Sequence, residues 1–224
     1  MIQRPTTEGE VAFDVPNAGK PVSTWYKIIG DLSIPRPALV LLHGGPGAGH
    51  SYLSSHLDLY DYYGIPLVFY DEIGGGKSTH LREKMGDEEF WTVDLFRKEL
   101  DNLIDHLGLR KHGFYILGHS WGGVLAGAYA SLQPAGLKKA VIASGPSDLS
   151  LYAKGTRDLL RRLPGDVQKI IEDCERRGDY DNPEFEKASA VFAAHFVCRL
   201  EPWPQPVQEA FENLKDDPTT YLTM

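Results

Sequence analysis

One serine of the chain stands in a motif whose spacing is typical of a nucleophile. Residues 118–122 read Gly-His-Ser-Trp-Gly, the pattern G-x-S-x-G, with Ser120 at the centre. An apolar, strand-like run at 114–120 leads into the motif, and a run of small residues typical of a helix follows it. In this setting the turn is sharp, and the serine oxygen stands at the end of a sheet above a helix N-terminus. The pattern predicts Ser120 as a nucleophile that attacks carbonyl groups, and the alternative is a glycine-bounded turn with an inert serine.

A serine that attacks a carbonyl group also needs hydrogen-bond donors for the oxyanion that forms. The N–H of the next residue, Trp121, is the first expected donor. The second is expected from residues 43–47, His-Gly-Gly-Pro-Gly, which follow another apolar run. Because Pro46 has no N–H, a neighbouring glycine must donate. We expect this donor to be Gly45, with Gly44 as the alternative donor and a substrate contact.

The glycine-rich stretch Asp71–Thr79, DEIGGGKST, invites a different interpretation, a phosphate-binding loop. That loop requires G-x-x-x-x-G-K-[ST] and must open a helix. Here the position of the first glycine is Asp71, whose charge would repel phosphate, and residues 80–90 have no apolar stripe. The stretch is therefore expected to be a structural loop, with Lys77 in solvent.

The elements that must position these motifs alternate in type along the chain. Apolar runs at 37–45, 65–71, 114–120 and 137–145 predict buried strands, and helical patterns at 50–63, 87–107 and 121–134 separate them. Residues 9–15 and 22–30 flank a turn signal and predict an antiparallel hairpin. The alternation indicates an α/β fold with a mostly parallel sheet.

The pattern changes after Gly145. Helices are expected at 149–163, 166–177, 183–200 and 206–215, with glycines and prolines between them and no strand-like run. We therefore expect two parts, an α/β core over residues 1–147 and a helical cap over residues 148–224.

The composition is that of an ordinary globular protein, with 42% hydrophobic and 24% charged residues. The formal net charge of −8 argues against nucleic acid or an anionic membrane as partner. The N-terminus shows no apolar segment of a signal peptide, and no apolar run has the length of a membrane span. Cys174 and Cys198 have no metal-ligand spacing and are expected to be free thiols. These features predict a cytoplasmic protein.

Three motifs in their order, HGGPG at 43–47, YDEIGGGKS at 70–78 and GHSWGG at 118–123, resemble the proline iminopeptidase family. The resemblance extends to a CRLEPWP stretch at 198–204 and implies the α/β-hydrolase fold with a helical cap. It implies a serine aminopeptidase or amino-acid amidase acting on small peptides or amino-acid amides, without metal or organic cofactor. Glu201 is a candidate to hold the ammonium group of the substrate. Glu72 stands where glutamine is usual in the family.

The chain offers no clear acid and base for a catalytic triad. In this fold the order is Ser, then Asp or Glu, then His. The one histidine after Ser120 is His195, which lies in a helical pattern, and Asp148 after the last strand is a weak substitute for the acid. The resemblance implies that two strands carrying the acid and base follow Met224. We therefore expect an open sheet edge, with self-association or completion by a second chain.

Other functions remain open. An esterase of the same fold is one alternative, because the motifs do not specify the leaving group. An epoxide hydrolase would carry aspartate at the position of Ser120. A non-catalytic module with the same fold is the alternative from a different class, favoured by the missing acid and base.

Overall fold

The computed structural model describes residues 4–224. By its internal contacts the chain divides into two compact units, one running to Gly145 and including Pro206–Met224, the other comprising Pro146–Gln205. The expected division into 1–147 and 148–224 stays a prediction about domains. Between Arg4 and Met224, none of the helices combines the length and the apolar character that a membrane span requires.

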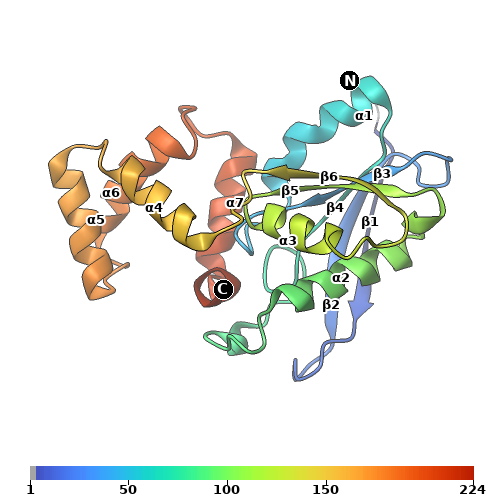
Figure 1. The fold of residues 1–224 in the computed structure, drawn as a ribbon, viewed down its shortest axis with the longest axis horizontal. Coiled ribbons are helices and arrows are strands. Elements are labelled where there is room, and N and C mark those ends of the chain that lie inside the picture. Colours follow the sequence, from blue (N-terminus) through green and yellow to red (C-terminus); the bar gives the residue numbers. More distant parts are fainter. Residues whose placement is uncertain (1–3) are drawn as a thin grey trace. The chain divides into compact units, whose positions relative to one another are not determined.

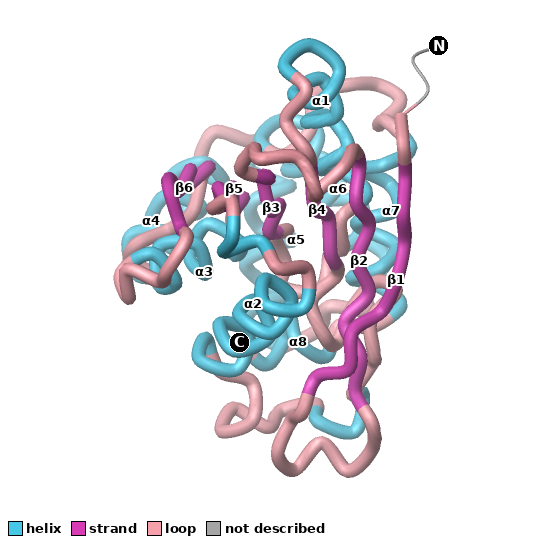
Figure 2. The backbone as a smooth tube through the Cα atoms, turned by 90° about the vertical axis from the view of Figure 1, so that its right-hand side faces the viewer, coloured by secondary structure: helices cyan, strands magenta, loops and turns pink. Residues whose placement is uncertain are grey.

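Within the described residues, the first unit contains one six-stranded sheet in the order β1-β2-β4-β3-β5-β6 (Figures 1 and 2). The strands are β1 (Thr6–Phe13), β2 (Val22–Ile29), β3 (Ala38–Leu42), β4 (Leu67–Tyr70), β5 (Phe114–His119) and β6 (Leu137–Ala143). β1 pairs antiparallel with β2, and β2 with β4, whereas β4, β3, β5 and β6 run parallel. This confirms the predicted α/β sheet with its antiparallel N-terminal hairpin.

Helices cover both faces of the sheet because its central strands are apolar on both sides. The short helix η1 (Ser51–His56) and α1 (Leu57–Tyr63) pack on one face against Leu39, Leu41 and Phe69. α2 (Val93–His106) and α3 (Trp121–Ala130) cover the opposite face, where Val40, Val68 and Ile116 point (Figure 1). The short helices η2 (Arg82–Lys84) and η3 (Leu109–Lys111) lie in connections.

Several predictions of helix boundaries needed correction. The helices expected over 121–134 and 183–200 end earlier, at Ala130 and Phe196. The helix expected from residue 87 begins at Val93, because the Thr92 hydroxyl accepts a hydrogen bond from Leu95 N–H and caps it there. The helix expected over 50–63 is divided into η1 and α1. β6 forms one edge of the sheet, where Val141 and Ile142 are half exposed. The further strands that the resemblance implies would lie outside these 224 residues and stay a prediction.

The second unit is helical. It contains α4 (Leu149–Leu160), α5 (Gly165–Arg177) and α6 (Pro183–Phe196), which pack around Leu160, Leu163, Ile171 and Ala188. The chain then returns to the first unit through α7 (Gln205–Asp216) and α8 (Thr219–Thr223). The sequence pattern did not predict α8.

Candidate active site

Ser120 occupies the turn between β5 and α3 in a backbone conformation that is unusual for a residue with a side chain. Its φ is 55° and its ψ is −118°. Such a conformation costs about 1–3 kcal/mol and persists only where the surroundings enforce it. Here Ser120 N–H donates to Ala143 O of β6 at 2.9 Å, and the Ser120 carbonyl accepts from Gly123 N–H at the start of α3. The turn is therefore held at both ends by backbone hydrogen bonds.

The glycines of the motif allow strand and helix to approach closely. A Cβ added to Gly118 would overlap the carbonyl group of Gly122, and one added to Gly122 would overlap the carbonyl of Leu42. Both positions therefore exclude any larger residue. This explains in physical terms why glycines stand two positions before and two positions after Ser120.

The loop His43–Gly47 follows β3 and lies against the serine. A Cβ built on Gly44 would stand 3.1 Å from Ser120 Cβ. The N–H of Gly44 is already engaged, because it donates to Tyr52 Oη at 2.7 Å. Within residues 4–224, the structure shows no hydrogen bond from the N–H groups of Gly45 or Trp121, nor one to Ser120 Oγ. Of the two glycines considered, Gly45 is thus the one with a free donor.

Tyr52 links this loop to the residue before the serine, and the sequence contained no signal for this role. Its phenol accepts from Gly44 N–H and is 2.9 Å from His119 Nδ1. Burial raises the pKa of Tyr52 and lowers the pKa of His119, so both side chains are neutral at physiological pH. The phenol hydrogen is then available to His119 Nδ1. The His119 ring is thus engaged with Tyr52.

His43 connects the same loop to the loop after β4. Its Nδ1 is 2.9 Å from Gly44 O, and its Nε2 is 3.0 Å from Glu72 N. Because the first partner is an acceptor and the second a donor, the ring is neutral and carries its hydrogen on Nδ1. Burial also lowers the pKa of His43, which agrees with this form.

The glycine-rich stretch after β4 packs against the loop His43–Gly47. A Cβ on Gly75 would come within 2.7 Å of Gly47 Cα. Asp71 organises the stretch by accepting from His50 N–H at 2.7 Å, the His50 ring at 2.8 Å and Lys77 N–H at 2.9 Å. Lys77 itself is exposed over the Trp25 ring, and no helix begins at the end of the stretch. The stretch is a structural loop, as expected.

The C-terminal helices α7 and α8 also contact these two loops. Asn213 Nδ2 donates to Ala48 O at 3.0 Å, and Leu214 Cδ2 lies 3.3 Å from a Cβ built on Gly45. Buried Asp217, between α7 and α8, is 2.5 Å from His80 Nδ1, and His80 Nε2 is 3.0 Å from Gly76 O. Local sequence patterns could not indicate the contacts of Asn213, Leu214 and Asp217, because each joins residues more than a hundred positions apart.

Three residues considered from the sequence belong to the second unit, Pro146–Gln205. Glu201 is exposed. His195 is exposed, and its Nδ1 is bonded to Val191 O of its own helix at 2.8 Å. Asp148 caps α4 by accepting from Ser150 N–H and Leu151 N–H. The side chain of Asp148 thus has a capping role. The roles considered for Glu201 and His195 stay predictions.

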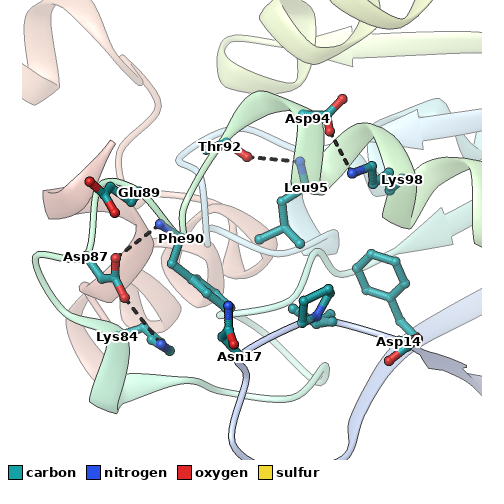
Figure 3. A pocket seen from close by; sticks show the side chains of 13 residues that line it. Asp14, Asn17, Lys84, Asp87, Glu89, Phe90, Thr92, Asp94, Leu95 and Lys98 are labelled. Atoms are coloured by element: carbon teal, nitrogen blue, oxygen red, sulfur yellow. Dashed lines mark hydrogen bonds and ion pairs between the residues drawn. The ribbon is translucent and has the colours of Figure 1, made fainter.

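A hollow of about 440 Å³ lies beside the end of β1 and the start of α2, but the predicted site residues are not among those that line it (Figure 3). Its Asp87 and Asp94 are engaged with Lys84 and Lys98. Within residues 4–224, no three His, Cys, Asp or Glu side chains form a group that could hold a metal ion.

Known proteins share the arrangement. The α/β-hydrolase fold family model matches residues 37–224. The chain is 35% identical over 186 residues to the proline iminopeptidase of Lactobacillus helveticus (strain DPC 4571), covering 82% of this chain and 61% of that protein. It is 38% identical over 179 residues to that of Saccharolobus solfataricus, covering 78% of this chain and 54% of that protein. The chain thus spans between 54% and 61% of the length of these two curated relatives.

Solved structures give the same result. The crystal structure of VinJ has a TM-score of 0.88 with 39% identity and covers 96% of this chain and 70% of that one. The crystal structure of the Mycobacterium smegmatis proline iminopeptidase has a TM-score of 0.80 with 30% identity, with 95% and 69% covered.

Proposed function

Because the chain belongs to the α/β-hydrolase fold family and, within it, to the proline iminopeptidases, we propose that it is part of a serine hydrolase that releases an N-terminal amino acid such as proline. The substrates would be small peptides or amino-acid amides. The proteins it resembles carry the name proline iminopeptidase, and the bonds this chain acts on are inferred from that likeness and from the site.

The first chemical step would be attack by Ser120 Oγ on the carbonyl carbon of the residue to be released. The carbonyl π bond opens and its electrons move to the oxygen, where the N–H groups of Gly45 and Trp121 donate to the oxyanion. A general base takes the serine proton and returns it to the leaving amine as the C–N bond breaks. We assign this base to no residue of the chain.

The second step would be hydrolysis of the ester formed between Ser120 and the amino acid. Water attacks the acyl carbon, the same two N–H groups hold the oxyanion, and Ser120 leaves with a proton. A carboxylate suits the free ammonium group of the substrate, and Glu201 is the residue that we predict for it. No step requires a cofactor.

The observation that carries this proposal is the backbone of Ser120. A non-glycine residue at φ 55° and ψ −118°, between a strand and a helix, is costly and has no structural benefit of its own. In support of this, the N–H groups of Gly45 and Trp121, the two proposed donors, make no other hydrogen bond among the described residues. Strain of this kind concentrates at sites of chemistry, which favours a nucleophile over an inert turn.

The test is hydrolysis of prolyl- and alanyl-arylamides, compared with matched amino-acid esters, by the protein carrying these residues. We expect cleavage of the arylamides and a loss of at least about 1,000-fold in kcat/KM for Ser120→Ala. Ser131→Ala, which changes an exposed serine at the end of the same helix, serves as the matched control. Cleavage of the esters alone would instead make the protein an esterase.

A further inference from the structure

Three buried polar atoms without a partner belong to Tyr70, Glu72 and Glu99, and Glu72 contacts Trp121 of the nucleophile turn. In the described part of the chain, five buried side-chain polar atoms make no hydrogen bond, and three of them are Tyr70 Oη, Glu72 Oε1 and Glu99 Oε2. All three side chains are fully buried, at 0% exposure. Each such atom is costly if it stays unpaired, so a cluster of them needs an explanation.

The other oxygen of each carboxyl group is well satisfied. Glu72 Oε2 accepts from the Trp121 indole N–H at 3.0 Å. Glu99 Oε1 accepts from Thr24 Oγ1 at 2.6 Å and from Ile73 N–H at 2.9 Å. These donors fix the orientation of both carboxyl groups, so that each presents its second oxygen to the interior.

Burial and neighbouring negative charge act on both carboxyl groups. Burial raises the pKa of Glu72 well above its usual range, and the nearby charge of Glu99 raises it further. Burial also raises the pKa of Glu99, although the hydrogen bonds from Thr24 and Ile73 oppose this. Burial and both carboxyl groups raise the pKa of Tyr70, which is therefore a neutral phenol.

The titratable groups around the pair do not neutralise it. Asp71 adds negative charge that raises the pKa of both glutamates. His43, which accepts from Glu72 N–H, is the neutral ring described above. Tyr52 and Tyr129, which interact with Glu72 and Tyr70, have raised pKa values and carry no charge. Glu99 is bonded to the N–H of Ile73, the residue after Glu72. Two ionised carboxylates would thus remain buried in one region without a compensating cation.

We propose that Glu72 and Glu99 share a proton between Glu72 Oε1 and Glu99 Oε2, and that this carboxyl pair positions Trp121. One proton turns the repulsion between two carboxylates into a charge-assisted hydrogen bond, and the Tyr70 O–H can donate to the same pair. Glu72 then keeps a fixed position from which it holds the Trp121 indole. The proposed oxyanion donor is the backbone N–H of Trp121, which the indole position helps to fix. The positioning role therefore rests on the proposed function, whereas the shared proton does not.

Glutamine substitutions test the shared proton directly. In Glu72→Gln or Glu99→Gln, the new amide N–H₂ stands where the unpartnered oxygen was and supplies the hydrogen permanently, while the amide oxygen keeps the other bonds. In the double variant two N–H₂ groups face each other without an acceptor. Each single variant should therefore fold stably, and the double variant should melt about 5 °C or more below the lower of the two.

The pH dependence of unfolding gives the second readout. A carboxyl group with a raised folded-state pKa contributes stability that is lost as pH rises from the unfolded value, about 4.3, towards the folded value. The melting temperature of the wild type should therefore fall between pH 5 and pH 9. The melting temperature of Glu72→Gln should fall clearly less over the same range. Glu88→Gln, the same change at an exposed site, should follow wild type. Equal pH slopes for wild type and Glu72→Gln, or a double variant as stable as the singles, would overturn the shared proton.

Labelling of Ser120 by a fluorophosphonate tests the positioning role. The ratio of the wild-type labelling rate to the Glu72→Gln rate should be near one at pH 6 and should fall several-fold by pH 9, as the pair loses its proton. A constant ratio would overturn the positioning of Trp121. Absence of label in every protein would overturn the proposed function instead, and the unfolding measurements would still decide on the shared proton.

Discussion

The backbone N–H of Gly44 donates a 2.7 Å hydrogen bond to Tyr52 Oη, so the loop beside Ser120 is tied to a side chain eight residues further on. The bond removes Gly44 from the possible oxyanion donors and leaves Gly45. It also connects the loop to β5 through the contact of the same phenol with His119.

The first prediction concerns the hydrogen bond from Gly44 N–H to Tyr52 Oη. Tyr52→Phe removes both hydrogen bonds and leaves Gly44 N–H buried without a partner, which should cost about 1–2 kcal/mol of unfolding free energy. We expect kcat for arylamide hydrolysis to fall about tenfold with KM little changed, because the donor loop loses its anchor. An increase in kcat would show that Gly44 N–H, once released, is the better donor, and would contradict the choice of Gly45.

The second prediction concerns Gly45 itself. Its φ of 118° suits glycine, and an added Cβ would lie 2.8 Å from the backbone nitrogens of Gly47 and Ala48. Gly45→Ala must shift the loop, and kcat should fall at least about 100-fold, as for the loss of an oxyanion donor. Gly86→Ala is the matched control, since Gly86 also has a positive φ but an added Cβ meets nothing within 4 Å. It should cost about 1–2 kcal/mol of stability without affecting kcat.

The third prediction concerns the backbone strain at Ser120. Glycine relieves a positive φ and alanine does not, so Ser120→Gly should be more stable than Ser120→Ala by about 1 kcal/mol. At Ser131, where φ is −61°, the order should be reversed. Chemical denaturation of the four variants measures both differences. Equal stability of the two Ser120 variants would mean that the turn is not strained.

The fourth prediction concerns the attachment of the C-terminal helices. Burial acts to raise the pKa of Asp217, but hydrogen bonds from Thr219 and His80 outweigh it and leave the pKa below its ordinary value. A lowered folded-state pKa contributes stability above the unfolded value, about 3.9, and the contribution is lost as pH falls through the folded value. Asp217→Asn should therefore cost about 2 kcal/mol at pH 7 and less below pH 4.

The neighbouring residue gives the control for this measurement. Asp216 is exposed and pairs with Arg82 at the surface, so Asp216→Asn should change the unfolding free energy by less than about 1 kcal/mol. If both asparagine variants behave alike at pH 7, the buried contact with His80 does not hold the segment.

The sheet and the serine motif were predictable because their signals are local. Apolar runs identify β3, β4 and β5, and the strand–turn–helix context identifies the turn at Ser120. The roles of Tyr52 and Asp217 were not predictable, since they depend on contacts across the fold; His80 and Asp217 are 137 residues apart. The same holds for Asn213 and Ala48, whose contact helps to place the residues after Pro206 in the first unit.

The most direct test of Ser120 as the nucleophile is to locate the covalent adduct left by a fluorophosphonate, by mass spectrometry of peptides from wild type, Ser120→Ala and Ser131→Ala. We expect a single modified residue, Ser120, in wild type and in Ser131→Ala, and no adduct in Ser120→Ala. Label on another serine, or equal labelling of Ser120→Ala and wild type, would contradict the assignment of Ser120 as the nucleophile.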